Sequence, residues 1–144
     1  METTWGWLGW ALMSAVFAAM TAIFAKIGVA GIDSDMATWV RTVVILGILT
    51  GFVIAMGKWQ DPRTISPRTW TFLVLSGFAT GASWLCYFRA LKLGDASKVA
   101  PVDKISVLLV VVFAFLFLGE RPSSREWLGV VAISVGVLLL AIKR

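Results

Sequence analysis

The sequence predicts an all-α membrane protein that crosses the bilayer five times. Its 144 residues are 59% hydrophobic and only 15% charged, with a mean hydropathy of +0.88, whereas soluble domains carry about 25% charged residues. Five apolar stretches each approach the roughly 17 to 25 residues that a helix needs to span the hydrocarbon core. They cover residues 5–25, 36–56, 70–91, 97–118 and 127–142. We therefore expect one domain over residues 1–144, multi-pass in the cell (inner) membrane.

Helix-end signals agree with these stretches. The first stretch has no basic residue before it and is too long for the apolar core of a signal peptide, so we expect it to stay as a helix. Capping residues precede the other helices. These are Asp33-Ser34-Asp35 before the second, Ser66-Pro67 before the third, Asp95 before the fourth, and Ser123 with Glu126 before the fifth. Pro101 lies early in the fourth helix, where we expect it to cause a kink.

The composition excludes several kinds of function. Cys86 is the only cysteine and histidine is absent, so neither an internal disulfide nor a zinc or copper site is expected. The net charge of +5 comes from cations scattered singly at helix ends, which does not make a nucleic-acid surface. No nucleophile stands at a workable spacing from a base. We expect no enzymatic activity, no cofactor and no nucleic-acid partner.

The loop charges favour neither orientation in the membrane. Five helices place the two termini on opposite faces, and each face then carries five cations. One face has Lys58, Arg63, Arg68, Arg121 and Arg125, and the other has Lys26, Lys92, Lys98, Lys143 and Arg144. Because an excess of lysine and arginine normally sets orientation, this balance predicts insertion both ways round (dual topology). A small error in the predicted helix ends would instead leave one orientation preferred.

Charged residues within the apolar stretches are the strongest functional signal. A charge near the bilayer centre costs at least about 2.5 kcal/mol on insertion scales, so such residues need partners or a function. Arg41, Asp103 and Lys104 lie within stretches, and Lys26 and Arg89 lie near stretch ends. At about 1.5 Å per residue, all five fall in the same outer third of the membrane.

We expect Asp103 to face Arg41, whose forked guanidinium suits a carboxylate. Lys104 should point about 100° away from its neighbour Asp103, which would prevent those two from pairing. The surplus of cations favours anionic or zwitterionic solutes over simple cations. Two alternatives stay open: Arg41 and Asp103 form either a solute site or a static clamp, and Lys26 and Arg89 either join the site or extend to the interface.

Three aromatic residues within the stretches are candidates for a pocket wall. Trp84 and Tyr87 are three residues apart in the third stretch, and Trp10 lies in the first. Aromatic faces can hold flat or cationic groups. Packing against lipid or other helices is the alternative for each of them.

Small residues form a seam on the last stretch. Gly129, Ala132 and Gly136 recur on nearly one helix face, and small residues let membrane helices approach closely. This seam could contact the same helix of a second copy, or it could pack within one chain.

Two motifs resemble a known family. They are the run from Tyr87 to Pro101 (YFRALKLGDASKVAP) and the turn Leu118-Gly119-Glu120-Arg121, followed by the small-residue seam. Together with Lys26 and Arg41 they resemble an EamA-type domain of the drug/metabolite transporter superfamily over essentially the whole chain. Most members carry two such domains as inverted halves. The resemblance implies that two copies of this single-domain chain form an antiparallel homodimer equivalent to a ten-helix inverted-repeat transporter.

The last stretch also resembles the dimer-forming helix of the four-helix small multidrug resistance transporters. In those proteins a substrate-binding glutamate lies eight positions before a lysine in the first helix. Counting back from Lys26 gives Ala18, so this sequence departs from that proton-coupled mechanism for lipophilic cations.

These observations favour a secondary transporter of small metabolites, anionic or zwitterionic by preference, working by alternating access as a homodimer. Its substrate would contact Arg41, Asp103, Lys104, Trp84, Tyr87, Lys26 and Trp10. One alternative is an exporter of cationic or aromatic compounds. Another is a non-transporting membrane subunit of a heteromer.

Overall fold

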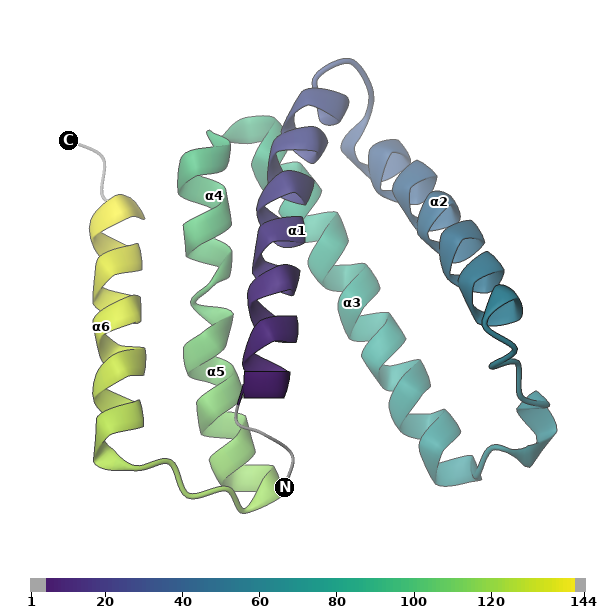
Figure 1. Cartoon of the computed structure of the whole chain (residues 1–144). Coiled ribbons are helices and arrows are strands. Elements are labelled where there is room, and N and C mark those ends of the chain that lie inside the picture. The colour runs from purple at the N-terminus through teal and green to yellow at the C-terminus, as the bar shows by residue number, and fades with distance from the viewer. Residues whose placement is uncertain (1–4, 142–144) are drawn as a thin grey trace. The chain divides into compact units, whose positions relative to one another are not determined.

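A computed structural model describes residues 5–141 and shows five helical segments long and apolar enough to cross a membrane (Figure 1). The elements are α1 (Trp5–Val29), α2 (Ser34–Ala55), the 3-10 turn η1 (Pro62–Thr64), α3 (Pro67–Leu93), α4 (Ala96–Asp103), α5 (Ser106–Phe113), the π-helical turn η2 (Ala114–Leu118) and α6 (Ser124–Ala141). Their ends lie within four residues of the predicted ones. Residue 142 and the cations Lys143 and Arg144, which entered the charge balance, lie outside the described residues.

The predicted caps of the second, third and fifth spans are confirmed. The Asp33 carboxylate accepts hydrogen bonds from the backbone N–H groups of Asp35 and Met36, at 2.8 and 3.3 Å. Before α3, the Ser66 hydroxyl accepts a bond from the Thr69 N–H at 3.1 Å. Before α6, the Glu126 carboxylate accepts bonds from the Ser123 N–H at 2.6 Å and from its hydroxyl at 2.8 Å. Asp95 precedes α4 without a capping bond, and its carboxylate instead contacts Lys98 at 3.2 Å.

The fourth span is interrupted after Pro101, as the sequence predicts. Proline lacks the N–H of a regular helical bond, and the chain tightens locally, because the Lys104 N–H donates to the Pro101 carbonyl three residues back. The prediction that Asp103 and Lys104 would not pair is wrong: the Lys104 Nζ lies 3.3 Å from the Asp103 carboxylate. The expected 100° separation assumed a continuous helix and a rigid lysine. Here α4 ends at Asp103, and the flexible lysine stem reaches back.

The described chain divides into two compact units, residues 5–93 and 94–141. In the first unit α1, α2 and α3 meet at one end, where α1 turns into α2 and α3 finishes. The buried residues of this unit lie in the halves of the helices nearest that end. They are Ala22, Ala25, Val29, Ser34, Ala37, Thr38, Phe88 and Leu91.

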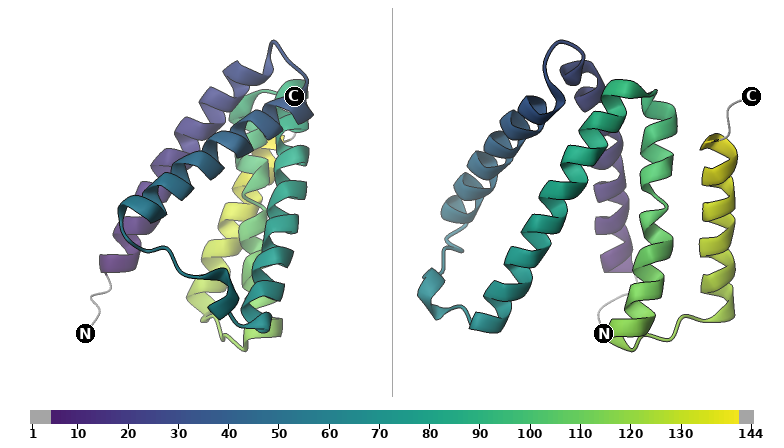
Figure 2. Two further views of the ribbon diagram at one scale, coloured as in Figure 1. Left: turned by 90° about the vertical axis from the view of Figure 1, so that its right-hand side faces the viewer. Right: turned by 180° about the vertical axis from the view of Figure 1, so that it is seen from behind.

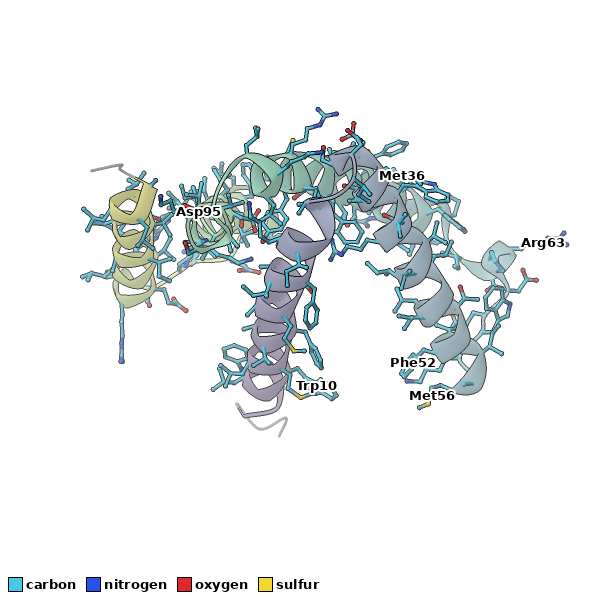
Figure 3. All side chains as sticks on the ribbon, turned by 90° about the horizontal axis from the view of Figure 1, so that it is seen from above. Trp10, Met36, Phe52, Met56, Arg63 and Asp95 are labelled. Carbon is cyan, nitrogen blue, oxygen red and sulfur yellow. The ribbon has the colours of Figure 1, made fainter. Side chains whose placement is uncertain are left out.

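Away from this end α1 and α2 diverge. Figure 3 shows Trp10 on α1 far from Phe52 and Met56 on α2, whereas Met36 lies where the two helices approach each other. Small side chains explain the close end, because the buried Ala22 and Ala25 on α1 and Ser34 and Ala37 on α2 add little bulk where the helices meet. The larger side chains beyond them, such as Phe52, are exposed.

The second unit is an antiparallel hairpin of α4–α5 and α6 (Figure 2). Its turn is set by Gly119, whose φ of 69° ends the π-helical turn in the left-handed conformation that glycine adopts most easily. On α6 the packed face carries the buried Val130 and Val137 and the half-buried Ser134. These positions are three or four residues apart and so share one face of the helix.

Candidate functional site

Three cationic side chains hold the close end of the first unit together. The Arg89 guanidinium donates to both carboxylate oxygens of Asp35, at 3.0 Å from Nε and 2.7 Å from an Nη atom. The Lys92 Nζ donates to the Ile32 carbonyl, and the Lys26 Nζ donates to the Leu91 carbonyl, each at 2.6 Å. We call these three contacts the polar latch. They join the last turn of α1, the α1–α2 turn and the first turn of α2 to the last turns of α3.

The latch uses the chemistry of helix ends. The last carbonyl groups of a helix have no partner within the helix, and Leu91 is two residues from the end of α3. A lysine ammonium close to such carbonyls also opposes the negative end of the helix dipole. Lys26 and Arg89 therefore have partners within the unit, rather than only the interfacial water that snorkelling would give them.

A cavity of about 370 Å³ lies beside the latch, between α1 and α2, with α3 behind it. It is at the lower end of the roughly 300–1,000 Å³ typical of small-molecule sites. Its wall is mostly apolar and includes Phe24, Ile32 and Phe88. Arg41 is the one charged residue in this wall, and Ile32 belongs to both the cavity and the latch.

Arg41 extends the inward face of α2 one turn beyond the buried Ala37 and Thr38. Its guanidinium carbon lies 4.2 Å from the ring centroid of Trp84 and 5.6 Å from that of Phe88. Trp84 and Phe88 are four residues apart on α3, so both rings present themselves to one side of that helix. A cation over aromatic faces gains about 0.5 to 2 kcal/mol, more as water is excluded.

Within residues 5–93, no carboxylate lies within ion-pair distance of Arg41, and its guanidinium makes no hydrogen bond. Its stacking on Trp84 and Phe88 therefore positions the charge without neutralising it. The five N–H donors of a guanidinium suit planar anions. The arrangement is a half-buried, aromatic-held cation beside a cavity of metabolite size.

The other predicted residues of the first unit lie at different distances from this cavity. Tyr87 is half-buried, and its ring meets that of Phe88 edge-on at a centroid separation of 6.4 Å. Lys26 is in the latch, next along the chain to the cavity residue Ala25. Trp10 is 75% exposed and lies three turns of α1 before the cavity residues (Figure 3). The structure brings together Arg41 and Trp84, with Tyr87 and Lys26 adjoining them.

Asp103 and Lys104 belong to the second unit, where they form an ion pair with each other. The expected pairing of Asp103 with Arg41 stays a prediction. The second unit has a cavity of its own of about 380 Å³ between α5 and α6, into which Glu120, Glu126 and Gly129 face. Among residues 5–141, no group of three or more histidine, cysteine, aspartate or glutamate side chains could hold a metal ion.

Sequence reasoning missed most residues of this region, among them Thr21, Phe24 and Phe88 of the cavity wall and Asp35 of the latch. Phe88 had a signal, since it lies one helical turn from Trp84. Asp35 was interpreted only as part of a cap, although an acid at the start of one helix and Arg89 at the end of the next are neighbours in an antiparallel pair. Thr21 and Phe24 had no signal, because nothing distinguishes them from other residues of an apolar stretch.

The small-residue seam on α6 is exposed. At 100° per residue, Ala132 and Gly136 point away from the packed face of Val130, Ser134 and Val137, whereas Gly129 lies at the edge of that face and lines the cavity between α5 and α6. A Cβ added at Gly129 or Gly136 would meet no atom within 4 Å. Packing of α6 within its own unit therefore uses the other face.

Comparison with known proteins identifies the family. Residues 5–142 match the EamA-like transporter family. An uncharacterized transporter in the cobO 3′ region of a Sinorhizobium species is 61% identical over 136 residues, which are 94% of this chain and 96% of that protein. No solved structure matches the chain.

Two further relatives differ in size or assembly. An uncharacterized transporter of Bacillus subtilis is 27% identical over 136 residues, 94% of this chain but 42% of that protein. The probable 4-amino-4-deoxy-L-arabinose-phosphoundecaprenol flippase subunit ArnE of Yersinia pestis is 32% identical over 84 residues, 58% of this chain and 74% of that protein. The family match covers nearly the whole chain, and the five apolar spans agree with it. The chain belongs to the EamA-like transporter family, within the drug/metabolite transporter superfamily, and is a multi-pass membrane transporter rather than an enzyme.

Proposed function

We propose that the chain is a secondary transporter of small anionic or zwitterionic metabolites, and that it works by alternating access as an antiparallel homodimer. The observation that carries this proposal is Arg41. Its guanidinium is held on Trp84 beside a cavity, with no carboxylate near it in its unit. A cation within the membrane is costly, so it needs a partner or a function, and the anionic group of a solute would supply one.

Each predicted residue then has a role. Arg41 orients the anionic group of the solute, while Trp84 and Tyr87 shape the wall behind it. Asp103 holds Arg41 in the empty state or carries a coupling proton. A carboxylate that alternates between Lys104 and Arg41 would release the guanidinium when the solute arrives. Lys26 acts through the latch, and Trp10 lies on the path along α1 toward the cavity.

The shape of the first unit supports alternating access. Its helices are latched and packed at one end and diverge toward the other. Such a unit admits solute from the open end while the latch closes the other. The Asp35 and Arg89 side chains are 47% and 61% exposed, and exposed ion pairs contribute little to stability. The latch can therefore open at small cost.

Two observations support a homodimer. In an 18-residue window of each span only 6–17% is buried within the chain, which leaves apolar surface for a second copy as well as for lipid. The Bacillus relative is more than twice the length of the segment it shares with this chain. Two copies of this chain would supply the equivalent of two halves, related as the inverted repeats of many carriers. The exposed α6 seam offers one close-packing surface between them.

Counterflow in proteoliposomes tests the transport proposal without knowledge of the coupling ion. Vesicles are preloaded with an unlabelled solute and diluted into the labelled form, for a panel of amino acids, phosphorylated metabolites, carboxylates and organic cations. We expect saturable exchange of at least one anion or zwitterion, abolished by Arg41→Met and unchanged by Arg63→Met, which removes an exposed cation in η1. Exchange restricted to cations, or equal exchange by Arg41→Met, would contradict the proposal.

Two other functions have specific support. An exporter of cationic or aromatic compounds would use the aromatic wall, and exchange that survives Arg41→Ala but fails in Trp84→Ala would favour it. The likeness to ArnE, which is named as a flippase subunit, favours a subunit of a heteromer. Co-purification of this chain from its own host with a second five-helix chain, in place of a second copy, would establish that alternative.

A further inference from the structure

We infer that Thr21 is a specificity-determining residue of the Arg41 cavity, and that this cavity takes an organic monoanion whose remaining body is apolar. The inference rests on the proposed function and narrows it. Neither the sequence pattern nor the relatives point to Thr21. It is the one uncharged polar residue of the cavity wall.

Thr21 and Arg41 lie at the same depth. Thr21 is eight residues before the end of α1 at Val29, and Arg41 is seven residues after the start of α2 at Ser34. At 1.5 Å per residue these distances are about 12 and 10 Å from the α1–α2 turn. Because the two helices are antiparallel, Thr21 from α1 and Arg41 from α2 line the same cavity at the same depth.

The Thr21 hydroxyl is available to a ligand. Thr38 and Thr42 on α2 donate their hydroxyl hydrogens to carbonyls four residues back, at 2.9 and 2.8 Å. Within the described part of its unit, the half-buried Thr21 makes no such bond. A hydroxyl that has no partner in an apolar wall can donate a hydrogen bond to one oxygen of a bound anion while Arg41 binds the second oxygen.

The rest of the wall limits the body of the ligand. Seven of the nine lining residues are apolar, among them Phe24, Val40 and Phe88, and none is acidic. One guanidinium neutralises one negative charge. A second anionic group, or an ammonium group, would lose its hydration without gaining a charged partner there. The cavity therefore favours one carboxylate-sized anionic group on an apolar body.

A matched set of probes tests this inference by calorimetric binding to the purified protein in detergent. The probes are 3-phenylpropanoate, its neutral amide, 3-phenylpropylammonium, and phenylalanine, which differs from the first by one ammonium group. We expect 3-phenylpropanoate to bind at least about tenfold more tightly than the other three. Saturable binding of the ammonium probe or phenylalanine with equal or higher affinity, or no binding of 3-phenylpropanoate, would overturn the substrate class.

Two variants test Thr21 itself. Thr21→Val keeps the shape and loses the hydroxyl, so the affinity for 3-phenylpropanoate should fall about tenfold, while Thr21→Ser should restore it. Monodisperse elution of each variant verifies folding. Wild-type affinity in Thr21→Val, with binding abolished by Arg41→Met, would remove the role of Thr21 but keep the Arg41 site. Wild-type affinity in Thr21→Val and also in Arg41→Met would remove the proposed site as well.

Discussion

Arg41 is an intramembrane cation that rests on aromatic rings. Charged residues within membrane spans usually face a partner charge or a water-filled space. In its unit Arg41 has the rings of Trp84 and Phe88 on one side and a cavity on the other. The rings hold the guanidinium beside the cavity, with its central carbon 4.2 Å from the Trp84 centroid. A planar, forked donor held in this way can select a planar oxyanion.

Arg41→Lys should therefore be damaging although it keeps the charge. A lysine ammonium is a point charge on a flexible stem and lacks the fork that bonds two oxygens. We expect the counterflow rate for the best anionic solute to fall about tenfold, whereas Trp84→Phe, which keeps an aromatic face, should lose less. Equal rates for Arg41→Lys and wild type would show that only charge matters at this position.

The sequence could reveal Arg41, Trp84 and Tyr87 because charged and amphipathic residues are conspicuous in apolar stretches. Thr21 could not be found in this way. Its role depends on which face of α1 turns toward α2 and on the depth at which the two helices diverge. Those features follow from packing between the small side chains near the α1–α2 turn, which a sequence shows only as composition.

At the scale of the helices, the polar latch lies at the end of the first unit where α1, α2 and α3 pack together. It contains one ion pair, Asp35–Arg89, and two lysine-to-carbonyl bonds. The Ile32 carbonyl accepts from Lys92 while the residue lines the cavity. We therefore expect a change in the latch to shift part of the cavity wall.

Breaking the Asp35–Arg89 pair should slow transport without unfolding the protein. Asp35→Ala and Arg89→Ala each leave the closed end less populated, so we expect several-fold slower counterflow. The exchange Asp35→Arg with Arg89→Asp should recover part of the rate, because the pair can re-form with reversed charge.

Lys98→Ala is the matched control for the latch. Its ion pair with Asp95 lies on the first turn of α4, within a single helix, and should leave the rate unchanged. If the double variant with exchanged charges showed slower counterflow than both single variants, the Asp35–Arg89 pair would not act as a latch.

Helix positions were largely predictable, and the contacts between helices were not. Hydropathy located every span, and capping residues located three of the four later helix starts. Pro101 indicated the break in the fourth span. The sequence suggested that Asp103 and Lys104 would stay apart, but that break let them pair. The Asp35–Arg89 contact depends on the register of α2 against α3.

At the scale of the whole molecule, the described chain buries little of its own surface. The face of α6 that carries Gly129, Ala132 and Gly136 is exposed, while Val130 and Val137 pack within the unit. Small residues at an exposed position contribute little packing energy to the single chain. They would allow close approach of a second α6.

Bulk on the seam should weaken the dimer. Ala132→Leu and Gly136→Leu should lower the dimer fraction in liposomes, measured by single-molecule photobleaching, about tenfold or more. Val131→Leu adds bulk at a neighbouring exposed position on another face and should have no effect. An unchanged dimer fraction in both seam variants would place the dimer contact elsewhere.

Dual topology is a separate prediction of the balanced loop charges. Reporters fused to the C-terminus, one active only in the cytoplasm and one only outside it, should both give signal. Adding two lysines to the loop between α2 and α3 should shift the population to one orientation. Signal from a single reporter in the unaltered chain would rule out dual insertion and with it an antiparallel homodimer.

The central claim is that the Arg41 cavity is hydrated and positively charged. Its most direct test uses Val40→Cys in a Cys86→Ser background, since Val40 lines the cavity and Cys86 is the one other thiol. The cysteine at position 40 is reacted with a sulfonate-bearing and with a quaternary-ammonium methanethiosulfonate. Each rate is divided by the rate of the same reagent with a small free thiol in solution. A charge a few ångströms away contributes about 1 kcal/mol even in bulk water, so we predict at least about fivefold preference for the anionic reagent, lost in Arg41→Met. No reaction with either reagent, or a preference for the cationic one, would contradict the account.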